Sequence, residues 1–210
     1  MSTSTVRRQP IAIVSLEWDV VDLIESCGRF MIAGFFDPSP VCDPKEFRHL
    51  GPDEAWSTAL ATIPDLKAAL AIDPPEARAR LFSHYGADSL VTLLSPRAYV
   101  SARASIGAGS IVQHGVTVMP GARIGTACKL NVNSTVHHEA TIGAFTTLAP
   151  GSQILGNVTI EERVYVGAGA IIRQRCRVGA GAVIGAGAVV VQDVPPGATV
   201  VGVPASRRLR

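Results

Sequence analysis

Residues suited to proton transfer cluster at His137-His138-Glu139. Histidine exchanges its proton near neutral pH, so an imidazole is the side chain that most often serves as a general base. A neighbouring carboxylate, here Glu139, can orient the ring and make it a stronger base. His138 and His137 are therefore both candidates for the base; the plainest interpretation of either is a surface histidine without chemistry.

A metal site is not indicated by the sequence. The cysteines show no Cys-x-x-Cys spacing. They are Cys27, Cys42, Cys128 and Cys176. We expect no bound metal, and we expect these cysteines to be buried small residues in a reducing compartment.

The element that must position His138 is a repeat of six residues. Every sixth residue from Leu94 to Val190 is Val, Ile or Leu, and a second column, two residues earlier, is small or β-branched throughout. Cys128 and Cys176 fall in this second column and should point inward. A period of six matches neither a helix nor a simple strand, but it fits a triangular coil with three six-residue sides. The sequence therefore predicts a parallel β-helix in which each turn consists of three hexapeptides.

Corners of this prism are expected directly after the aliphatic column, because glycine often stands there and tolerates left-handed backbone angles. These glycines are Gly107, Gly125, Gly143, Gly167, Gly179 and Gly185. A narrow prism leaves outer faces uncovered, and repeat proteins need neighbours or caps. We therefore predict a homotrimer of side-by-side prisms.

Register arithmetic separates two sets of residues on the prism. Pro150, Ala168 and Ala186 follow one another at intervals of one full turn and should stack on one corner, a class that His114 shares. His138 lies two hexapeptides before Pro150, which assigns it to another corner. A cleft that uses both corners is most easily formed between two neighbouring prisms.

The first part of the chain has a different pattern. Residues 11–15, 30–36, 66–72 and 90–94 are expected to be strands, and residues 19–28 and 74–85 helices, which indicates a small parallel α/β domain. Asp37 ends the second strand, as an acid does in nucleotide-binding α/β folds. The first strand-to-helix turn, Ser15 to Asp19, has no glycine for cradling phosphate. We place the domains at 1–92 and 93–195, with a tail at 196–210.

Charge is divided unevenly along the chain. Residues 1–93 carry 8 Lys and Arg against 13 Asp and Glu, whereas residues 94–210 carry 11 against 4. A basic second unit suits a phosphorylated ligand, and Arg173, Arg175 and Arg177 could meet such phosphates or simply form a solvated edge. Basic and aromatic residues are not interleaved, so nucleic acid is not favoured. No apolar run approaches a membrane span, and we expect a cytoplasmic protein.

Several stretches together resemble a known family. They are Leu130-Asn131, Val136-His137-His138-Glu139-Ala140-Thr141-Ile142-Gly143, Leu148-Ala149-Pro150-Gly151, Gly156-Asn157-Val158, Val166-Gly167-Ala168-Gly169-Ala170, Ile184-Gly185-Ala186-Gly187-Ala188-Val189-Val190 and Val200-Val201-Gly202-Val203-Pro204-Ala205. With a preceding α/β domain, the chain resembles the hexapeptide-repeat nucleotide-sugar acyltransferases of the sialic-acid and bacillosamine type. The resemblance implies a left-handed β-helix and a small Rossmann-like sugar-substrate domain.

The same resemblance implies an activity and a site. Such enzymes transfer acetyl from acetyl-CoA to an amine or hydroxyl of a nucleotide-linked sugar in surface-glycan biosynthesis, with a histidine matching His138 as general base. The implied cofactor contacts, in a groove between subunits, are Thr147, Gly167, Ala168 and Ala186. The implied substrate contacts are Asn131, Asp37 and Ser15, although Asn131 could equally belong to a structural ladder. In relatives a glycine loop, missing here, helps to bind the nucleotide-sugar.

Three alternatives remain from the sequence. A zinc carbonic anhydrase of this architecture needs three converging histidines, which His114, His137 and His138 do not offer by spacing. A non-catalytic binding protein would explain the altered turn at Ser15 to Asp19. A serine acetyltransferase shares the β-helix, but its N-terminal domain is typically helical.

Overall fold

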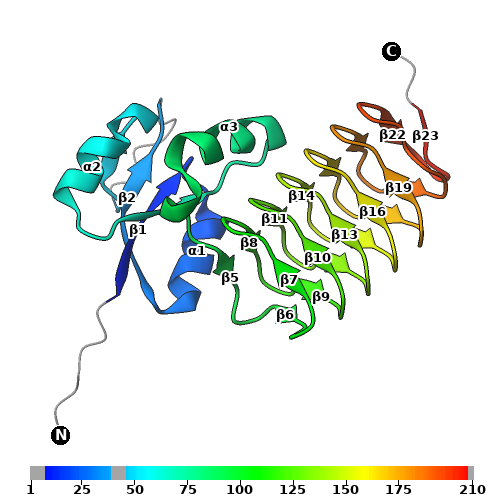
Figure 1. Ribbon diagram of the computed structural model, residues 1–210, viewed down its shortest axis with the longest axis horizontal. Coiled ribbons are helices and arrows are strands. Elements are labelled where there is room, and N and C mark those ends of the chain that lie inside the picture. Colours follow the sequence, from blue (N-terminus) through cyan, green and yellow to red (C-terminus); the bar gives the residue numbers. More distant parts are fainter. Residues whose placement is uncertain (1–7, 39–45, 208–210) are drawn as a thin grey trace, which may run out of the picture.

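The computed structural model describes residues 8–38 and 46–207, and every structural statement below concerns these residues. Figure 1 shows an α/β domain beside a prism of stacked coils, with the end of the chain at the far end of the prism. Among the described residues, no helix has the length and apolar character needed to cross a membrane.

The α/β domain is built on a four-stranded parallel sheet. Its strands are β1 (Gln9–Val14), β2 (Phe30–Phe36), β3 (His49–Gly51) and β4 (Lys67–Leu70), in the order β3-β2-β1-β4. The strand order reverses between β1 and β4, and in open α/β sheets such a reversal opens a crevice at the carboxyl ends of the strands. The side chain of Lys129, from the prism, enters this crevice.

Helices cover both faces of this sheet. One face is covered by α1 (Trp18–Cys27), whose residues at positions 20, 21, 23 and 24 are buried; the helix ends at Gly28, where φ is 67°. The other face is covered by α2 (Trp56–Thr62) and α3 (Pro75–Tyr85), with short 3-10 turns at Asp53–Ala55 and Ala87–Ser89. The apolar layer under α1 extends to Leu93 and Ile111 of the prism, so the two units share a core.

Most predicted elements of this domain are present. The strand at 30–36 and the helices near 19–28 and 74–85 are confirmed, and the strand expected at 66–72 is β4. The strand expected at 90–94 is reduced to a bridge between Leu90 and Ala68 and to β5 (Leu93–Leu94). β3 and α2 were not predicted, because a strand of three residues and a helix of seven are too short to show a period.

The prism consists of very short strands, each stacked on the strand one turn earlier in the chain. Leu130 pairs with Leu148, and Val136 pairs with Ile154, which confirms the predicted turn of three hexapeptides. After β5, the strands are β6 (Tyr99–Val100), β7 (Ser105–Ile106), β8 (Ile111–Val112), β9 (Thr117–Val118), β10 (Arg123–Ile124), β11 (Lys129–Leu130), β12 (Thr135–Val136), β13 (Thr141–Ile142), β14 (Thr147–Leu148), β15 (Gln153–Ile154), β16 (Thr159–Ile160), β17 (Tyr165–Val166), β18 (Ile171–Ile172), β19 (Arg177–Val178), β20 (Val183–Ile184) and β21 (Val189–Val190).

These strands form three parallel faces. The eight-stranded face contains β5, β8, β11, β14, β17, β20 and the strands that follow the repeat; the six-stranded face runs from β6 to β21, and the five-stranded face from β7 to β19. From Val112 to Val190 the aliphatic column is buried throughout. Cys128 and Cys176 lie in the same core, 1% and 3% exposed, as their column predicted. Cys42 lies outside the described residues.

The predicted reason for the corner glycines is wrong. Left-handed backbone angles recur every sixth residue from Gly109 to Gly187, three residues after the aliphatic column instead of one, and half of these positions are not glycine. The glycines directly after the column have ordinary angles. At Gly107 and Gly143, for example, a Cβ would lie 2.4 Å from a carbonyl carbon of the next coil. Glycine is required there because neighbouring coils approach closely.

The repeat shortens at its end. β22 (Thr199–Val201) pairs with β20 through Val183 and Thr199, a spacing slightly shorter than a full turn, and β23 (Ser206–Arg207) turns back antiparallel to β22. Residues after 195 therefore add the last strands of the eight-stranded face and close the end of the prism.

Candidate active site

His138 lies at an exposed corner of the prism. It follows β12 on the six-stranded face and precedes β13 on the five-stranded face. Its side chain is 57% exposed and that of Glu139 is 65% exposed. Glu139 is the left-handed residue of this corner, with φ of 59°, an angle that a glutamate adopts at some cost in energy. Solvent can therefore reach both side chains.

One ring nitrogen of His138 lies near the carboxylate of Glu139. Nδ1 lies 3.7 Å from Oε2 of Glu139, which is close enough for electrostatic attraction but too long for a hydrogen bond. The backbone beneath the ring is fixed, because the His138 carbonyl accepts a bond of 3.1 Å from Asn157 N. His137 is half-buried, with its ring centroid 6.5 Å from that of His138. Nδ1 is thus the ring nitrogen that faces the carboxylate of Glu139.

The residues expected to bind the cofactor divide into exposed and buried ones. Pro150, Ala168 and Ala186 are exposed and stack between the eight-stranded and six-stranded faces, on a different corner from His138. Gly167 is buried, and its amide donates to Ile184 O over 2.8 Å. A Cβ on Gly167 would lie 2.5 Å from Ala186 N, so this glycine is needed for coil packing.

Thr147 does not fit the cofactor contact expected for it. Its side chain is fully buried, and its hydroxyl donates to Asp73 O over 2.9 Å and accepts from Arg78 Nη2 over 2.7 Å. Both partners belong to the α/β domain. The outward position of Thr147 on β14 is covered by that domain, which the repeat register could not reveal.

Asn131 and His114 lie beside the exposed alanine corner and away from His138 of the same chain. Asn131 is 6% exposed and follows β11 on the eight-stranded face. His114 Nδ1 is 2.6 Å from Ser95 Oγ. Within one chain, the structure therefore brings neither residue to the candidate base.

The three arginines expected to meet phosphates do not lie on the same part of the prism. Arg173 and Arg175 are exposed on the corner that carries His138, two coils farther along. Arg177 instead points from the five-stranded face and pairs with Glu161, whose carboxylate also accepts from Ala180 N over 2.8 Å. That backbone bond, together with Arg177, lowers the pKa of Glu161. Arg177 is thus occupied within the chain.

Ser15 and Asp37 lie together at the carboxyl edge of the α/β sheet. Ser15 N donates to Phe36 O over 2.9 Å, and Asp37 N donates to Gly51 O over 3.1 Å. Ser15 has φ of 61°, a left-handed angle at a position where a glycine would be unstrained. The pairing of β1 with β2 therefore brings the two expected substrate residues to one edge.

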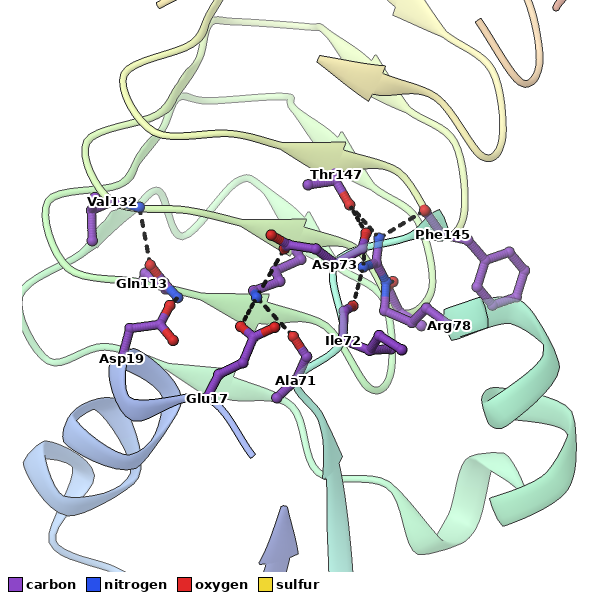
Figure 2. Close-up of polar contacts among 12 residues, drawn as sticks. Glu17, Asp19, Ala71, Ile72, Asp73, Arg78, Gln113, Val132, Phe145 and Thr147 are labelled. Atoms are coloured by element: carbon purple, nitrogen blue, oxygen red, sulfur yellow. Dashed lines mark hydrogen bonds and ion pairs between the residues drawn. The ribbon is translucent and has the colours of Figure 1, made fainter. Parts of the chain in front are cut away.

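The remainder of the β1–α1 turn binds the prism. Figure 2 shows Glu17 and Asp19 reaching from the start of α1 toward the prism. Glu17 pairs with the ammonium of Lys129, which also contacts Asp73 Oδ1 at 2.9 Å and donates to Ala71 O over 2.7 Å. Asp19 accepts from Gln113, whose Oε1 accepts from Val132 N over 3.2 Å. Lys129 thus occupies the crevice between the ends of β1 and β4.

Burial makes these ionic contacts costly as well as specific. The side chain of Lys129 is 2% exposed. Burial raises the pKa of the Glu17 carboxyl, and the attraction of Lys129 only partly offsets this rise. Two further acids, Asp73 and Asp19, add to the rise.

Arg78 forms a second tie between the two units (Figure 2). Its guanidinium donates to the carbonyls of Ala127 and Phe145 in the prism, at 2.7 and 2.8 Å, and to that of Ile72 at 2.7 Å. Together with the bonds to Asp73 O and Thr147 Oγ1, these contacts use every guanidinium nitrogen. Burial lowers the pKa of Arg78. The side chain is 1% exposed, so it holds the interface from inside.

Sequence reasoning missed this interdomain cluster of Glu17, Asp73, Arg78 and Lys129. Its partners lie far apart in the chain, with Lys129 112 residues after Glu17. The one available signal was a lysine at an outward strand position of the face where neighbouring coils carry Ile111 and Thr147. In the described residues, no group of three His, Cys, Asp or Glu side chains is arranged to hold a metal ion.

Comparison with known proteins supports the architecture in two ways. Residues 139–174 and 157–192 match the family described as bacterial transferase hexapeptide (six repeats). A GDP-perosamine N-acetyltransferase of Escherichia coli O157:H7 is 40% identical over 125 residues, which cover 57% of this chain and 57% of that protein. The chain thus spans little more than half the length of this curated relative.

Solved structures match nearly the whole chain. The acetyltransferase domain of PglB from Neisseria gonorrhoeae, in complex with acetyl coenzyme A, has a TM-score of 0.88 and 29% identity, over 96% of this chain and all of that one. PerB from Caulobacter crescentus, in complex with CoA and GDP-perosamine, has a TM-score of 0.86 and 26% identity, over 98% and 100%. A GDP-perosamine N-acetyltransferase from Caulobacter crescentus has also been solved with one histidine replaced by alanine, again with CoA and GDP-perosamine.

These likenesses confirm the predicted fold class, a small α/β domain followed by a left-handed parallel β-helix. The chain is a hexapeptide-repeat protein with the two-domain architecture of these sugar acetyltransferases.

Proposed function

We propose that this chain is an acetyl-CoA-dependent sugar N-acetyltransferase in which His138 is the general base. The observation that carries the proposal is the exposed imidazole of His138 on a prism corner, with Nδ1 turned toward Glu139. It is supported by the close likeness to proteins solved with acetyl coenzyme A, or with CoA and GDP-perosamine.

The proposed step is a direct acetyl transfer. The acceptor amine attacks the thioester carbonyl of acetyl-CoA while Nε2 of His138 takes the proton that the nitrogen loses. The carbon–sulfur bond then breaks, the amide remains on the sugar, and the proton passes from the imidazole to the departing CoA thiolate. Glu139, 3.7 Å from Nδ1, stabilises the imidazolium while it carries the proton.

The acetyl-CoA site is proposed to lie between two chains of a homotrimer. His138 and the exposed Pro150, Ala168 and Ala186 occupy different corners of one prism, so a cleft containing both requires a second prism. Small side chains on the alanine corner would allow the pantetheine arm to approach the backbone. Arg173 and Arg175, exposed and on the same corner as His138, are placed to meet CoA phosphates.

The acceptor is proposed to be a nucleotide-linked amino sugar held by the α/β domain, residues 1–92. Ser15 and Asp37 lie at the sheet edge where such folds bind ligands. An amine is preferred to a hydroxyl because the GDP-perosamine enzymes that this chain resembles are named N-acetyltransferases. We place the reaction in the cytoplasm, where acetyl-CoA and nucleotide sugars are made.

The test is a thiol-release assay with acetyl-CoA and a panel of GDP-, UDP- and dTDP-linked sugars, amino and neutral. We expect release only with amino sugars, and an acetylated product by mass spectrometry. Release with neutral sugars alone would move the reaction to hydroxyl transfer. Binding of acetyl-CoA without turnover on any sugar would favour the binding-protein alternative, and sedimentation as a monomer at micromolar concentration would remove the shared site.

A further inference from the structure

Gly156 lies one coil above His138, at the same corner. It stands one full turn later in the chain, and Asn157 N holds the His138 carbonyl over 3.1 Å. The two corners are therefore stacked directly on each other. Gly156 is buried although the ring beside it is exposed.

The imidazole of His138 occupies the space where a side chain of residue 156 would be. A Cβ on Gly156 would lie 2.6 Å from both Cε1 and Nε2 of His138, and 3.3 Å from Cδ2. Real Cβ atoms do not approach other heavy atoms to 2.6 Å, so this ring position exists only because residue 156 has no side chain.

Backbone strain does not explain this glycine. Its φ is ordinary, unlike that of Gly151 or Gly169 on another corner of the prism. Close packing of neighbouring coils explains Gly143 and Gly167, whose nearest atoms belong to the backbone of the next coil, but it does not explain Gly156. At Gly156 the three nearest atoms all belong to the His138 ring.

The nitrogen in this niche is the one the proposed reaction uses. Nδ1 faces Glu139, which leaves Nε2 for the proton, and Nε2 is one of the two ring atoms that lie against Gly156. We propose that Gly156 is a positioning residue: its missing side chain forms the niche that fixes the direction in which Nε2 of His138 points. The catalytic consequence rests on the proposed function, whereas the position of the ring does not.

A methyl group at residue 156 should displace the ring instead of unfolding the coil. The imidazole is the exposed end of a side chain and can rotate toward solvent, whereas the backbone of Gly156 needs no change in φ. A misdirected base loses most of its effect, because proton transfer requires hydrogen-bond reach. We expect Gly156→Ala to lower kcat by about 10- to 100-fold, at most the lower end of the roughly 10²- to 10⁴-fold contribution of a general base, and to change KM for acetyl-CoA less than about threefold.

The first measurement compares Gly156→Ala with the control Gly181→Ala. A Cβ on Gly181 meets nothing within 4 Å, and that residue lies on the corner between the five-stranded and eight-stranded faces. Its φ of 66° makes alanine strained there, so this variant tests backbone strain without any contact with His138. Imidazole signals in proton–nitrogen NMR spectra of the intact protein should shift for His138 in Gly156→Ala and stay in place in Gly181→Ala, with His138→Ala identifying the signal. An unshifted His138 signal in Gly156→Ala would overturn the proposal.

The second measurement adds Gly156→Ala to His138→Ala. If Gly156 acts only through the ring, the double variant should keep the residual rate of His138→Ala. A further fall in rate would show that residue 156 contributes in another way and would refute a purely positioning role. If the wild-type chain transfers no acetyl group, the proposed function fails, but the NMR comparison still decides whether Gly156 sets the ring.

Discussion

The molecule contains two clusters that pair a basic side chain with acids, and they are built in opposite ways. At the His138 corner, histidine and glutamate are more than half exposed and 3.7 Å apart. In the interdomain cluster, Lys129 and Arg78 are 2% and 1% exposed, and each makes several direct contacts. One cluster is open and loosely paired, whereas the other is closed and fully engaged.

This difference in burial suggests different roles: the exposed pair suits a reaction, whereas the buried cluster stabilises the fold. A buried charge must have its partners within the fold, because leaving it unpaired is costly. An exposed imidazole needs no partner within the fold, because water can form hydrogen bonds with it. The two clusters should therefore respond differently to substitution: one in rate without loss of stability, the other in stability first.

The largest effect is expected from His138→Ala. Removing a general base should lower kcat by about 10²- to 10⁴-fold, while the free energy of unfolding should change by less than about 0.5 kcal/mol, as is usual for exposed positions. Steady-state kinetics and urea denaturation measure the two quantities. His137→Ala serves as the control, and an equal loss of rate in that variant would transfer the role to His137.

Arg78→Ala should mainly lower the free energy of unfolding, the quantity that His138→Ala should leave nearly unchanged. Removing a buried cation that satisfies four carbonyls and Thr147 should cost about 3–5 kcal/mol of unfolding free energy. Arg80, exposed on the same helix, provides the control, and Arg80→Ala should cost less than about 0.5 kcal/mol. Equal urea midpoints for the two variants would mean that the interface does not depend on the guanidinium.

Lys129→Met should cost less than Arg78→Ala. It removes the cation between Glu17 and Asp73, but their side chains are 29% and 46% exposed, so water can solvate them in part. We expect a loss of about 1–3 kcal/mol, the range for leaving hydrogen-bonding groups unsatisfied. Thermal unfolding measures the change. A more stable variant would show that desolvation of this lysine outweighs all of its contacts.

The smallest effect concerns pH and Glu17. Burial raises the pKa of this carboxyl in the folded chain. An acid whose pKa is higher in the folded chain than in the unfolded chain binds its proton more tightly in the folded chain. Its stabilising contribution is therefore present at low pH and is lost as pH rises through the folded-state pKa. Unfolding free energy of the wild type, relative to Glu17→Gln, should therefore fall between pH 4 and pH 7 by up to about 1 kcal/mol. A relative rise over that range would mean that attraction to Lys129 dominates.

The sequence predicted those parts of the fold that repeat. A column of aliphatic residues at every sixth position is sufficient to place Val136 inside and His138 at a corner, because each coil has the same surroundings as the next. It also placed α1, whose buried residues follow a helical period and whose end is marked by Gly28. Periodicity carries this information only where the structure itself is periodic.

Unique contacts could not be predicted in this way. Thr147 occupies an ordinary outward position of the repeat, yet the α/β domain covers it, and no local pattern indicates that covering. Glu17 and Asp19 occupy the turn between β1 and α1, where a nucleotide-binding fold would carry its phosphate loop. Their partners are determined only by how the two units dock. The niche at Gly156 likewise depends on a rotamer of His138 in the coil below.

Docking through Lys129 has a geometric consequence. Lys129 belongs to the same coil as His138, and Thr147 to the coil above it, so the α/β domain is attached at the height of the candidate base. The later coils, from β17 onward, extend beyond this level toward β22 and β23 (Figure 1). The interval along the prism between the sheet edge at Ser15 and the level of His138 is therefore fixed by the fold. Under the proposed function, an acceptor of the wrong length would present its amine above or below the imidazole.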